Sequence, residues 1–371
     1  MMKLAIIHFQ PLEKYPPIVN LLNFLSQKGI ASIVFTTHPP EAFQLYANEL
    51  HKIVRFQSIN RVSFLRVLHY LRFYIGTIIH LIRYLPTHLI WFETLSSFPA
   101  IIYYYITTCK PKLFVHYHEY ESPEEILKGM FLSRVFHRME RKIYPKLNWL
   151  SQTNQDRLDF FLMDNPEINR KIARTMPNYP PKWWGNYRRK RCSNADTIKL
   201  VYVGALSTKT LYIKEIIELI KIANGKLSCD FYSFSVDKQT QMLFEQNKSH
   251  NINFRGAISQ SDFPLIISQY QIGLVLYKGH IPNYIYNAPN KLFEYLACGL
   301  DVWYPICMKG IDPYRRENTY PKVLPIDFDN IRDFNWQLAV CREGLKEEIK
   351  EFYFEDIYQE FTHELIRVIN P

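Results

Sequence analysis

The opening of the chain places a strand, a helix and a second strand in quick succession, and this order constrains the fold more than any other feature. The apolar run KLAIIHF, residues 3–9, has the composition of a buried strand, and residues 15–28 carry apolar side chains at helical spacing. Gly29 ends that helix, and residues 31–36 form a second apolar run. A β-α-β start of this kind is typical of a parallel sheet with helices on its faces.

The same alternation restarts in the second half of the chain. Residues 176–197 are rich in proline, polar and basic residues and read as a linker, whereas strand-like and helix-like runs alternate again from residue 198. The sequence therefore predicts an α/β protein with two doubly wound Rossmann-like domains and a cleft between them. The expected boundaries are 1–178, a linker at 179–197, a second domain at 198–344 and closing C-terminal helices at 345–371.

Charge narrows the classes of partner. The 371 residues include 45 Lys and Arg against 35 Asp and Glu, a net charge of +10, so an anionic partner is favoured: a nucleic acid, an acidic membrane surface or a phosphorylated small molecule. The hydrophobic fraction of 47% excludes a disordered chain. The six cysteines lie far apart and lack metal-ligand spacing, so we expect no metal site.

Two segments of the second half carry candidate residues for binding a nucleotide. In the strand-helix turn at 203–210, Gly204 allows close approach of the backbone to a ligand and Lys209 offers a charge for a phosphate. In the helix at 289–299, Lys291 and Glu294 lie on one face, where a cation suits a diphosphate and a carboxylate can accept both hydroxyls of a ribose. The alternatives are an ordinary turn with a solvated lysine and a plain i,i+3 ion pair.

The second half resembles the nucleotide-sugar-binding domain of GT-B glycosyltransferases, most closely the retaining family 4 group. Four segments carry the resemblance in the family's order, and the last, with its P-x-K-x-x-E-Y-x-A-x-G pattern before a strand, is the most specific. They are KLVYVGALSTKT (199–210), NINFRGAISQSDFPLIISQY (251–270), QIGLVLYKG (271–279) and APNKLFEYLACGLDV (288–302).

The resemblance implies roles for these residues. Lys291 would contact the phosphates of a nucleoside diphosphate sugar, Glu294 would bind its ribose, and the turn with Gly204 and Lys209 would lie beside the diphosphate. Asn290 and Tyr286 complete the predicted donor-binding set.

Two positions depart from the family's pattern. Tyr286 stands where the family commonly has the first Glu of a pair, and Ala205 stands where it commonly has an Arg, so Lys278 or Arg255 would supply part of the missing charge.

The first half offers a fainter match in HYHEYES, residues 116–122, which sits where such enzymes place a His-Asp or His-Glu pair at a strand end. His118 and Glu119 are the predicted catalytic residues: His118 would contact the donor sugar or phosphate, and Glu119 or Glu121 would orient it or an acceptor hydroxyl. A structural role for this His and Glu is the alternative. No cofactor is expected beyond the nucleoside diphosphate sugar as co-substrate, and no metal is required.

Two basic amphipathic stretches, 61–85 and 127–146, suit helices that lie on an anionic membrane. The alternative is that both pack on the first domain's sheet with their basic residues in water. The longest run free of charged residues, 94–109, has sixteen residues, fewer than the about 20 that a span needs. The N-terminus lacks a signal-peptide pattern. We therefore expect a cytoplasmic protein at the inner face of the cell membrane.

The predicted function is transfer of a sugar from a nucleoside diphosphate sugar to an acceptor hydroxyl, on a membrane-linked saccharide in surface polysaccharide assembly. Three alternatives remain open: a sugar-nucleotide epimerase of the same fold, an inactive glycosyltransferase homologue, and a non-catalytic binder of nucleic acid. The basic run from Arg188 to Arg191 motivates the last, although no recognised nucleic-acid motif accompanies it.

Overall fold

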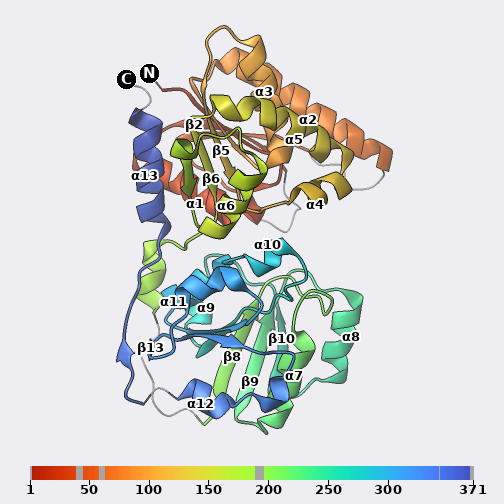
Figure 1. Ribbon diagram of the computed structural model, residues 1–371, viewed down its shortest axis with the longest axis vertical. Coiled ribbons are helices and arrows are strands. Elements are labelled where there is room, and N and C mark those ends of the chain that lie inside the picture. Colours follow the sequence, from red (N-terminus) through yellow and green to blue (C-terminus); the bar gives the residue numbers. More distant parts are fainter. Residues whose placement is uncertain (1, 39–44, 58–62, 189–195, 342, 368–371) are drawn as a thin grey trace. The chain divides into compact units, whose positions relative to one another are not determined.

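The computed structural model describes residues 2–38, 45–57, 63–188, 196–341 and 343–367. The chain forms two compact units (Figure 1). The first contains Met1–Asn178 together with Phe354–Pro371, and the second contains Tyr179–Tyr353. The C-terminal helix therefore belongs to the same unit as the N-terminus.

The first unit is built on a seven-stranded sheet in which every pair is parallel, in the order β3-β2-β1-β4-β5-β6-β7. The strands are β1 (Leu4–His8), β2 (Ser32–Thr37), β3 (His51–Phe56), β4 (His88–Phe92), β5 (Lys112–Tyr117), β6 (Trp149–Gln152) and β7 (Ala173–Thr175). All residues of β1, β2 and β4 are buried, as expected for strands covered on both faces.

Helices cover this sheet (Figure 1). They are α1 (Pro16–Gln27), α2 (Ser63–Tyr84), α3 (Ser97–Ile106), α4 (Pro123–Lys128), α5 (Phe131–Ile143), α6 (Gln155–Asp164) and α13 (Phe354–Arg367). Short 3-10 turns are η1 (Leu12–Lys14), η2 (Thr94–Ser96), η3 (Tyr144–Lys146) and η4 (Arg170–Ile172). Helix α3 packs against both α2 and α5, and α13 packs against α1, where the Tyr358 hydroxyl donates to the Pro17 carbonyl at 2.8 Å.

The second unit repeats the architecture with a six-stranded parallel sheet in the order β10-β9-β8-β11-β12-β14. The strands are β8 (Ile198–Val203), β9 (Leu227–Tyr232), β10 (Ile252–Gly256), β11 (Ile272–Leu274), β12 (Asp301–Pro305) and β14 (Val323–Ile326), with a separate pair β13 (Thr319–Tyr320) and β15 (Lys346–Glu347). The prediction of two doubly wound α/β domains is confirmed.

The helices of the second unit follow its strands. They are α7 (Ile213–Ile222), α8 (Lys238–Gln246), α9 (Phe263–Ile267), α10 (Pro282–Ile285), α11 (Asn290–Ala297) and α12 (Trp336–Val340), with 3-10 turns η5 (Lys182–Tyr187), η6 (Lys309–Tyr314) and η7 (Ile331–Asp333). Among the described residues, no helix is both long and apolar enough to cross a bilayer.

Gly273, in the central strand β11, fixes the distance between α11 and the sheet. A Cβ atom at this position would lie 2.2 Å from the ring of Tyr295, a fully buried residue of α11. Only glycine leaves room for this ring, so the approach of α11 to the sheet depends on one missing methyl group.

Gly273→Ala is expected to lower the free energy of unfolding of the second unit by about 3 kcal/mol, because a packed ring cannot yield to the added methyl without displacing α11. Urea unfolding measures the change. The control is Gly225→Ala, where φ is +83° and the space is open, so backbone strain alone costs about 1 kcal/mol. Equal losses in the two variants would contradict the steric account.

Candidate functional site

The first turn of α11 brings Lys291 and Glu294 together. Their Nζ and Oε2 atoms are 2.6 Å apart, and the side chains are 26% and 11% exposed. The Lys291 ammonium also lies 5.0 Å above the ring of Phe263, a cation–π distance. The i,i+3 ion pair given above as the alternative is therefore present. A ligand with a diphosphate and a ribose would have to separate this pair.

Tyr295 ties α11 to the strand end beside it. Its hydroxyl accepts a hydrogen bond from the Val203 amide at 3.1 Å, at the last residue of β8. Gly204 follows with φ of +151°, a conformation that favours glycine, and its amide donates to the Tyr232 carbonyl at 3.0 Å. The buried Tyr295 thus fixes the position of α11 relative to the turn that follows β8.

The remaining predicted donor residues lie on the surrounding loops. Lys209 is exposed in the turn after β8, and Lys278 reaches the same turn, with its Nζ 3.5 Å from the Thr208 carbonyl and 3.6 Å from the Glu215 carboxylate. Arg255 instead pairs with Asp230 at 3.0 Å. Of the two residues considered for extra positive charge, Lys278 is therefore the one that contacts the turn.

Tyr286 and Asn290 flank the approach to α11. Asn290 is the first residue of α11, and Tyr286 directly follows α10 as its C-cap; both are half-buried. The chain at Tyr286 is clamped by Gly310, where an added Cβ atom would lie 2.5 Å from the Tyr286 carbonyl carbon. The position that carries Glu in the resembling family is thus held by backbone packing in this chain.

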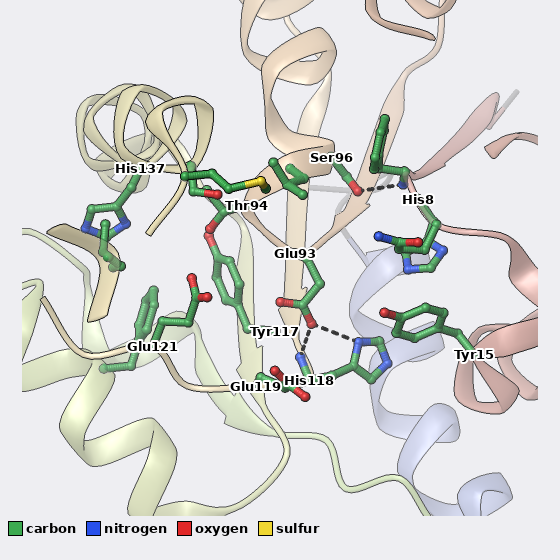
Figure 2. A pocket seen from close by; sticks show the side chains of 17 residues that line it. His8, Tyr15, Glu93, Thr94, Ser96, Tyr117, His118, Glu119, Glu121 and His137 are labelled. Carbon is green, nitrogen blue, oxygen red and sulfur yellow. Dashed lines mark hydrogen bonds and ion pairs between the residues drawn. The ribbon is translucent and has the colours of Figure 1, made fainter. Parts of the chain in front are cut away.

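A cavity of about 250 Å³ opens in the first unit at the carboxyl ends of β1, β4 and β5 (Figure 2). His8 ends β1, Glu93 follows β4, and His118 follows β5, and because these strands are neighbours, the three side chains meet. Ligands of open parallel sheets commonly bind at this edge. The polar lining includes His8, Glu93, Thr94, His118, Glu119 and Glu121.

Glu93 holds His118 by two hydrogen bonds. Its Oε1 accepts from the His118 amide at 2.6 Å and lies 3.1 Å from His118 Nδ1 (Figure 2). A carboxylate only accepts, so the proton in this contact is on Nδ1, and Nε2 is the ring nitrogen that remains for a ligand. Nε2 is buried and has no hydrogen-bond partner among the described residues. His118 is thus oriented and has one nitrogen left for a ligand.

The backbone of Glu93 is strained. Its φ of 65° and ψ of 155° fall in a region that is almost restricted to glycine and costs on the order of 1–3 kcal/mol. The Glu93 amide donates to the His116 carbonyl at 3.1 Å, which helps to hold this conformation. Strain at a cavity wall indicates that the position of this carboxylate matters. Sequence reasoning missed Glu93, which directly follows β4.

The carboxylates at the cavity raise one another's pKa values. Glu119 and Glu121 are exposed on their outer sides, but desolvation by the cavity walls, and next the nearby Glu93, raise the pKa of each. Burial, and next the neighbouring His118, lower the pKa of His8 to about 3, so the His8 ring is neutral at pH 7.

His116 differs from His118 in its surroundings. It is buried, its Nδ1 lies 2.9 Å from the Ser151 hydroxyl, and it is absent from the cavity lining. Burial, and next His118, lower its pKa well below the ordinary value. Of the two histidines of this motif, only His118 faces the cavity.

A fully buried carboxylate, Glu140 of α5, lies behind the cavity wall. Its Oε1 accepts from the Tyr117 hydroxyl at 2.7 Å and from Trp91 Nε1 at 3.2 Å. Burial raises the pKa of Glu140 to about 7, with the hydrogen bonds partly offsetting the shift. Tyr117 lines the cavity, so Glu140 supports one of its walls from behind.

The raised pKa of Glu140 predicts a pH dependence of stability. Between about pH 4.5 and 7 the folded state retains a proton that the unfolded state has lost, so the free energy of unfolding falls as pH rises through this window. From pH 5 to pH 8, the wild type should lose about 2 kcal/mol more than Glu140→Gln, as measured by urea unfolding. Glu245→Gln, at an exposed site, serves as control. A constant difference between wild type and Glu140→Gln would contradict the account.

Within the described ranges, no cluster of three or more His, Cys, Asp or Glu side chains has an arrangement that could hold a metal ion.

The fold is shared with solved sugar-processing enzymes. No protein-family model and no curated protein matches the sequence. Sucrose-phosphate synthase from Thermosynechococcus elongatus matches with a TM-score of 0.73 at 13% identity, over 100% of this chain and 99% of that one. The lipopolysaccharide outer core galactosyltransferase WaaB gives 0.65 at 13%, over 99% of each chain.

A structure with a bound nucleotide sugar and the structure of an epimerase are also similar. Anabaena HepE in complex with UDP-glucose gives a TM-score of 0.66 at 11% identity, over 99% of this chain and 100% of that one. A UDP-N-acetylglucosamine 2-epimerase gives 0.62 at 10%, over 99% of this chain and 96% of that one. At such low identity the likeness defines the fold: two parallel-sheet α/β domains of the GT-B glycosyltransferase type.

Proposed function

We propose that this protein is a glycosyltransferase that moves a sugar from a nucleoside diphosphate sugar to an acceptor hydroxyl. One observation carries the proposal. Lys291 and Glu294 share the first turn of α11, beside the Gly204 turn, in the second unit of a chain with the two-domain GT-B fold. One solved neighbour of that fold, Anabaena HepE, has structures in complex with UDP-glucose and with UDP and glucose.

In the proposed mechanism, the second unit stabilises the leaving group. The acceptor oxygen forms a bond to the anomeric carbon, the bond between that carbon and the diphosphate breaks, and the acceptor's proton passes to the leaving diphosphate. The negative charge that develops on the diphosphate meets Lys291, Lys209 and the N-terminus of α11. Glu294, released from Lys291, accepts the ribose hydroxyls. These groups supply the needed positive charge, so the proposal requires neither a metal nor a cofactor. The motif order supports membership of the retaining family 4 group and retention of configuration.

Helix α2 supports a membrane-linked acceptor. Its outward face carries a continuous row of exposed apolar side chains: Val67, Leu68, Leu71, Ile75, Ile79 and Ile82. Arg72 and Arg83 are exposed on the same helix. Arg61, also part of the predicted basic stretch, lies outside the described residues. An apolar row flanked by arginines suits an anionic lipid surface, and we place the acceptor, a saccharide of surface polysaccharide assembly, at the cytoplasmic face of a membrane.

The second basic stretch behaves differently. Residues 127–146 contain two helices, because the backbone at Gly129 is extended and separates α4 from α5. Leu127, Met130 and Phe131 are exposed near this break. The inner face of α5 packs on the sheet. Of this segment, only the exposed residues near the break between α4 and α5 therefore belong to the proposed lipid-facing surface.

The triple variant Leu71→Ser, Ile75→Ser, Ile79→Ser is expected to weaken association with phosphatidylglycerol vesicles by about 100-fold at low salt, because each side chain loses on the order of 1 kcal/mol of burial. Vesicle sedimentation measures it. The control replaces three exposed apolar residues of the second unit, Phe234, Met242 and Leu338, with Ser. A wild type that ignores anionic vesicles and glycosylates only soluble sugars would contradict the proposal.

Product analysis separates the alternatives. A glycosyltransferase releases a nucleoside diphosphate only when an acceptor is present, whereas an epimerase, whose solved structures share the fold, converts the donor alone. An inactive homologue binds the donor and yields neither product.

The contacts of Arg188 count against the nucleic-acid binder. Its guanidinium lies 3.4 Å from both the Ala297 carbonyl and the Tyr353 hydroxyl, so it is already engaged within the protein. The rest of its run, residues 189–191, lies outside the described residues.

A further inference from the structure

The cavity of the first unit has a charge opposite to that of the whole chain. Glu93, Glu119 and Glu121 line it, whereas no Lys or Arg of the described part of the chain does, although the chain carries a net charge of +10. Arg157 acts on Glu119, whose pKa its charge lowers, but Arg157 is itself buried and is not part of the described lining. Its guanidinium donates to the His118 carbonyl at 2.7 Å and to the Thr153 hydroxyl at 2.8 Å.

Two of the three imidazoles that line the cavity, His8 and His137, have lowered pKa values. His8 is neutral at pH 7, because burial and then His118 lower its pKa to about 3. Desolvation, and next Arg141, lower the pKa of His137. An anionic group in this space would therefore face three carboxylates with no Lys or Arg side chain in the described lining. A hydroxyl or ammonium group could donate hydrogen bonds to these carboxylates, and an ammonium group would also reduce the repulsion between them.

Two buried side chains point to a ligand independently of the carboxylates. His8 is 1% exposed and His118 is 8% exposed, and both line the cavity. The Nε2 atoms of both rings lack a hydrogen-bond partner of good geometry among the described residues. Buried polar atoms are normally satisfied, so a hydroxyl-bearing ligand or a water would be expected here.

The dimensions and walls suit one sugar ring. The volume is about 250 Å³, and Tyr15, Tyr117 and Phe161 supply apolar surface for the C–H face of a pyranose. Tyr15 lies beside His118, with ring centroids 5.9 Å apart (Figure 2). The combination of aromatic walls and convergent polar groups is typical of small-molecule sites.

On the basis of the proposed function, we infer that this cavity is the acceptor subsite and that it takes a sugar ring that is neutral or carries an ammonium group, and excludes one that carries a carboxylate or phosphate. For a lipid-linked acceptor, the diphosphate must then lie outside the cavity while the terminal sugar enters it.

Saturation-transfer NMR on the full chain at pH 7 tests the inference with four probes: methyl glucoside, glucosamine, glucuronate and glucose 6-phosphate. We expect transfer to the first two, strongest for glucosamine, and an affinity for glucuronate at least about tenfold lower than for glucosamine. The double variant Glu119→Gln, Glu121→Gln should lose this preference. The double variant Glu245→Gln, Glu351→Gln, at exposed sites away from the cavity, changes net charge equally and should keep it.

Failure of this inference can be distinguished from failure of the proposed glycosyltransferase function. Binding of glucuronate or glucose 6-phosphate as tight as that of methyl glucoside would overturn the inference, as would the absence of any transfer from the four probes. A nucleotide sugar that still bound in a manner dependent on Lys291 would leave the glycosyltransferase proposal intact in either case. Failure of every nucleotide sugar to bind would instead count against the proposed function itself.

Discussion

Lys291→Ala is expected to lower the rate of sugar transfer by about 100-fold, because a cation that meets the developing charge of a leaving diphosphate contributes mainly in the transition state. The variant removes the group that lies 2.6 Å from Glu294 at the start of α11. Steady-state transfer from the donor identified by product analysis measures the loss. Glu294→Gln should mainly weaken donor binding, since it removes one charged acceptor for the ribose hydroxyls.

A matched ion pair in the same unit provides the control. Lys309 and Asp312 are also three residues apart, with Nζ and Oδ2 3.8 Å apart and both side chains exposed. Lys309→Ala removes an i,i+3 lysine without touching α11, and it should leave transfer unchanged. If Lys291→Ala lowered only thermal stability and preserved transfer, the pair would be a structural contact and the donor site would have to lie elsewhere.

His118→Asn is expected to reduce kcat by a similar factor of about 100, because the imidazole nitrogen that Glu93 orients toward a ligand would be lost from the cavity. Glu93→Gln should cost about tenfold, since Glu93 acts through the orientation of His118. Nitrogen-15 shifts of the His118 ring report this positioning role directly: the wild type should show a proton on Nδ1, and Glu93→Gln a mixture of tautomers.

Two further variants separate function from structure at this edge of the sheet. His116→Asn alters a buried histidine that bonds Ser151 and does not line the cavity, so it should reduce stability and preserve kcat per folded molecule. Glu93→Gly relieves a backbone conformation that suits glycine, so it should fold well and still lose activity. Full activity in Glu93→Gly would remove the role assigned to this carboxylate.

The sequence was sufficient to predict the elements that depend on local periodicity. The two β-α-β patterns predicted both sheets, and the helix that ends before Gly299 forms as α11. The spacing of Lys291 and Glu294 predicted their contact, because residues three apart share one face of any helix. These features need only chain-local geometry, which is why composition and spacing were enough.

Other features depend on which strands are neighbours, and the sequence alone does not contain that information. Glu93 reaches His118 because β4 pairs with β5, and its positive φ leaves no signal in composition. Glu140 sits within a basic amphipathic stretch where a carboxylate looks solvated, yet α5 buries it completely. The break at Gly129 was likewise missed, because the apolar spacing continues across it.

Hydrogen exchange with a panel of UDP-, ADP- and GDP-sugars tests the central claim most directly. We predict that one donor slows exchange of the amides in residues 203–210 and 288–297, and that Lys291→Ala abolishes this protection. Absence of protection from every donor, or protection confined to segments other than these two, would contradict the assignment of α11 as the nucleotide-sugar site.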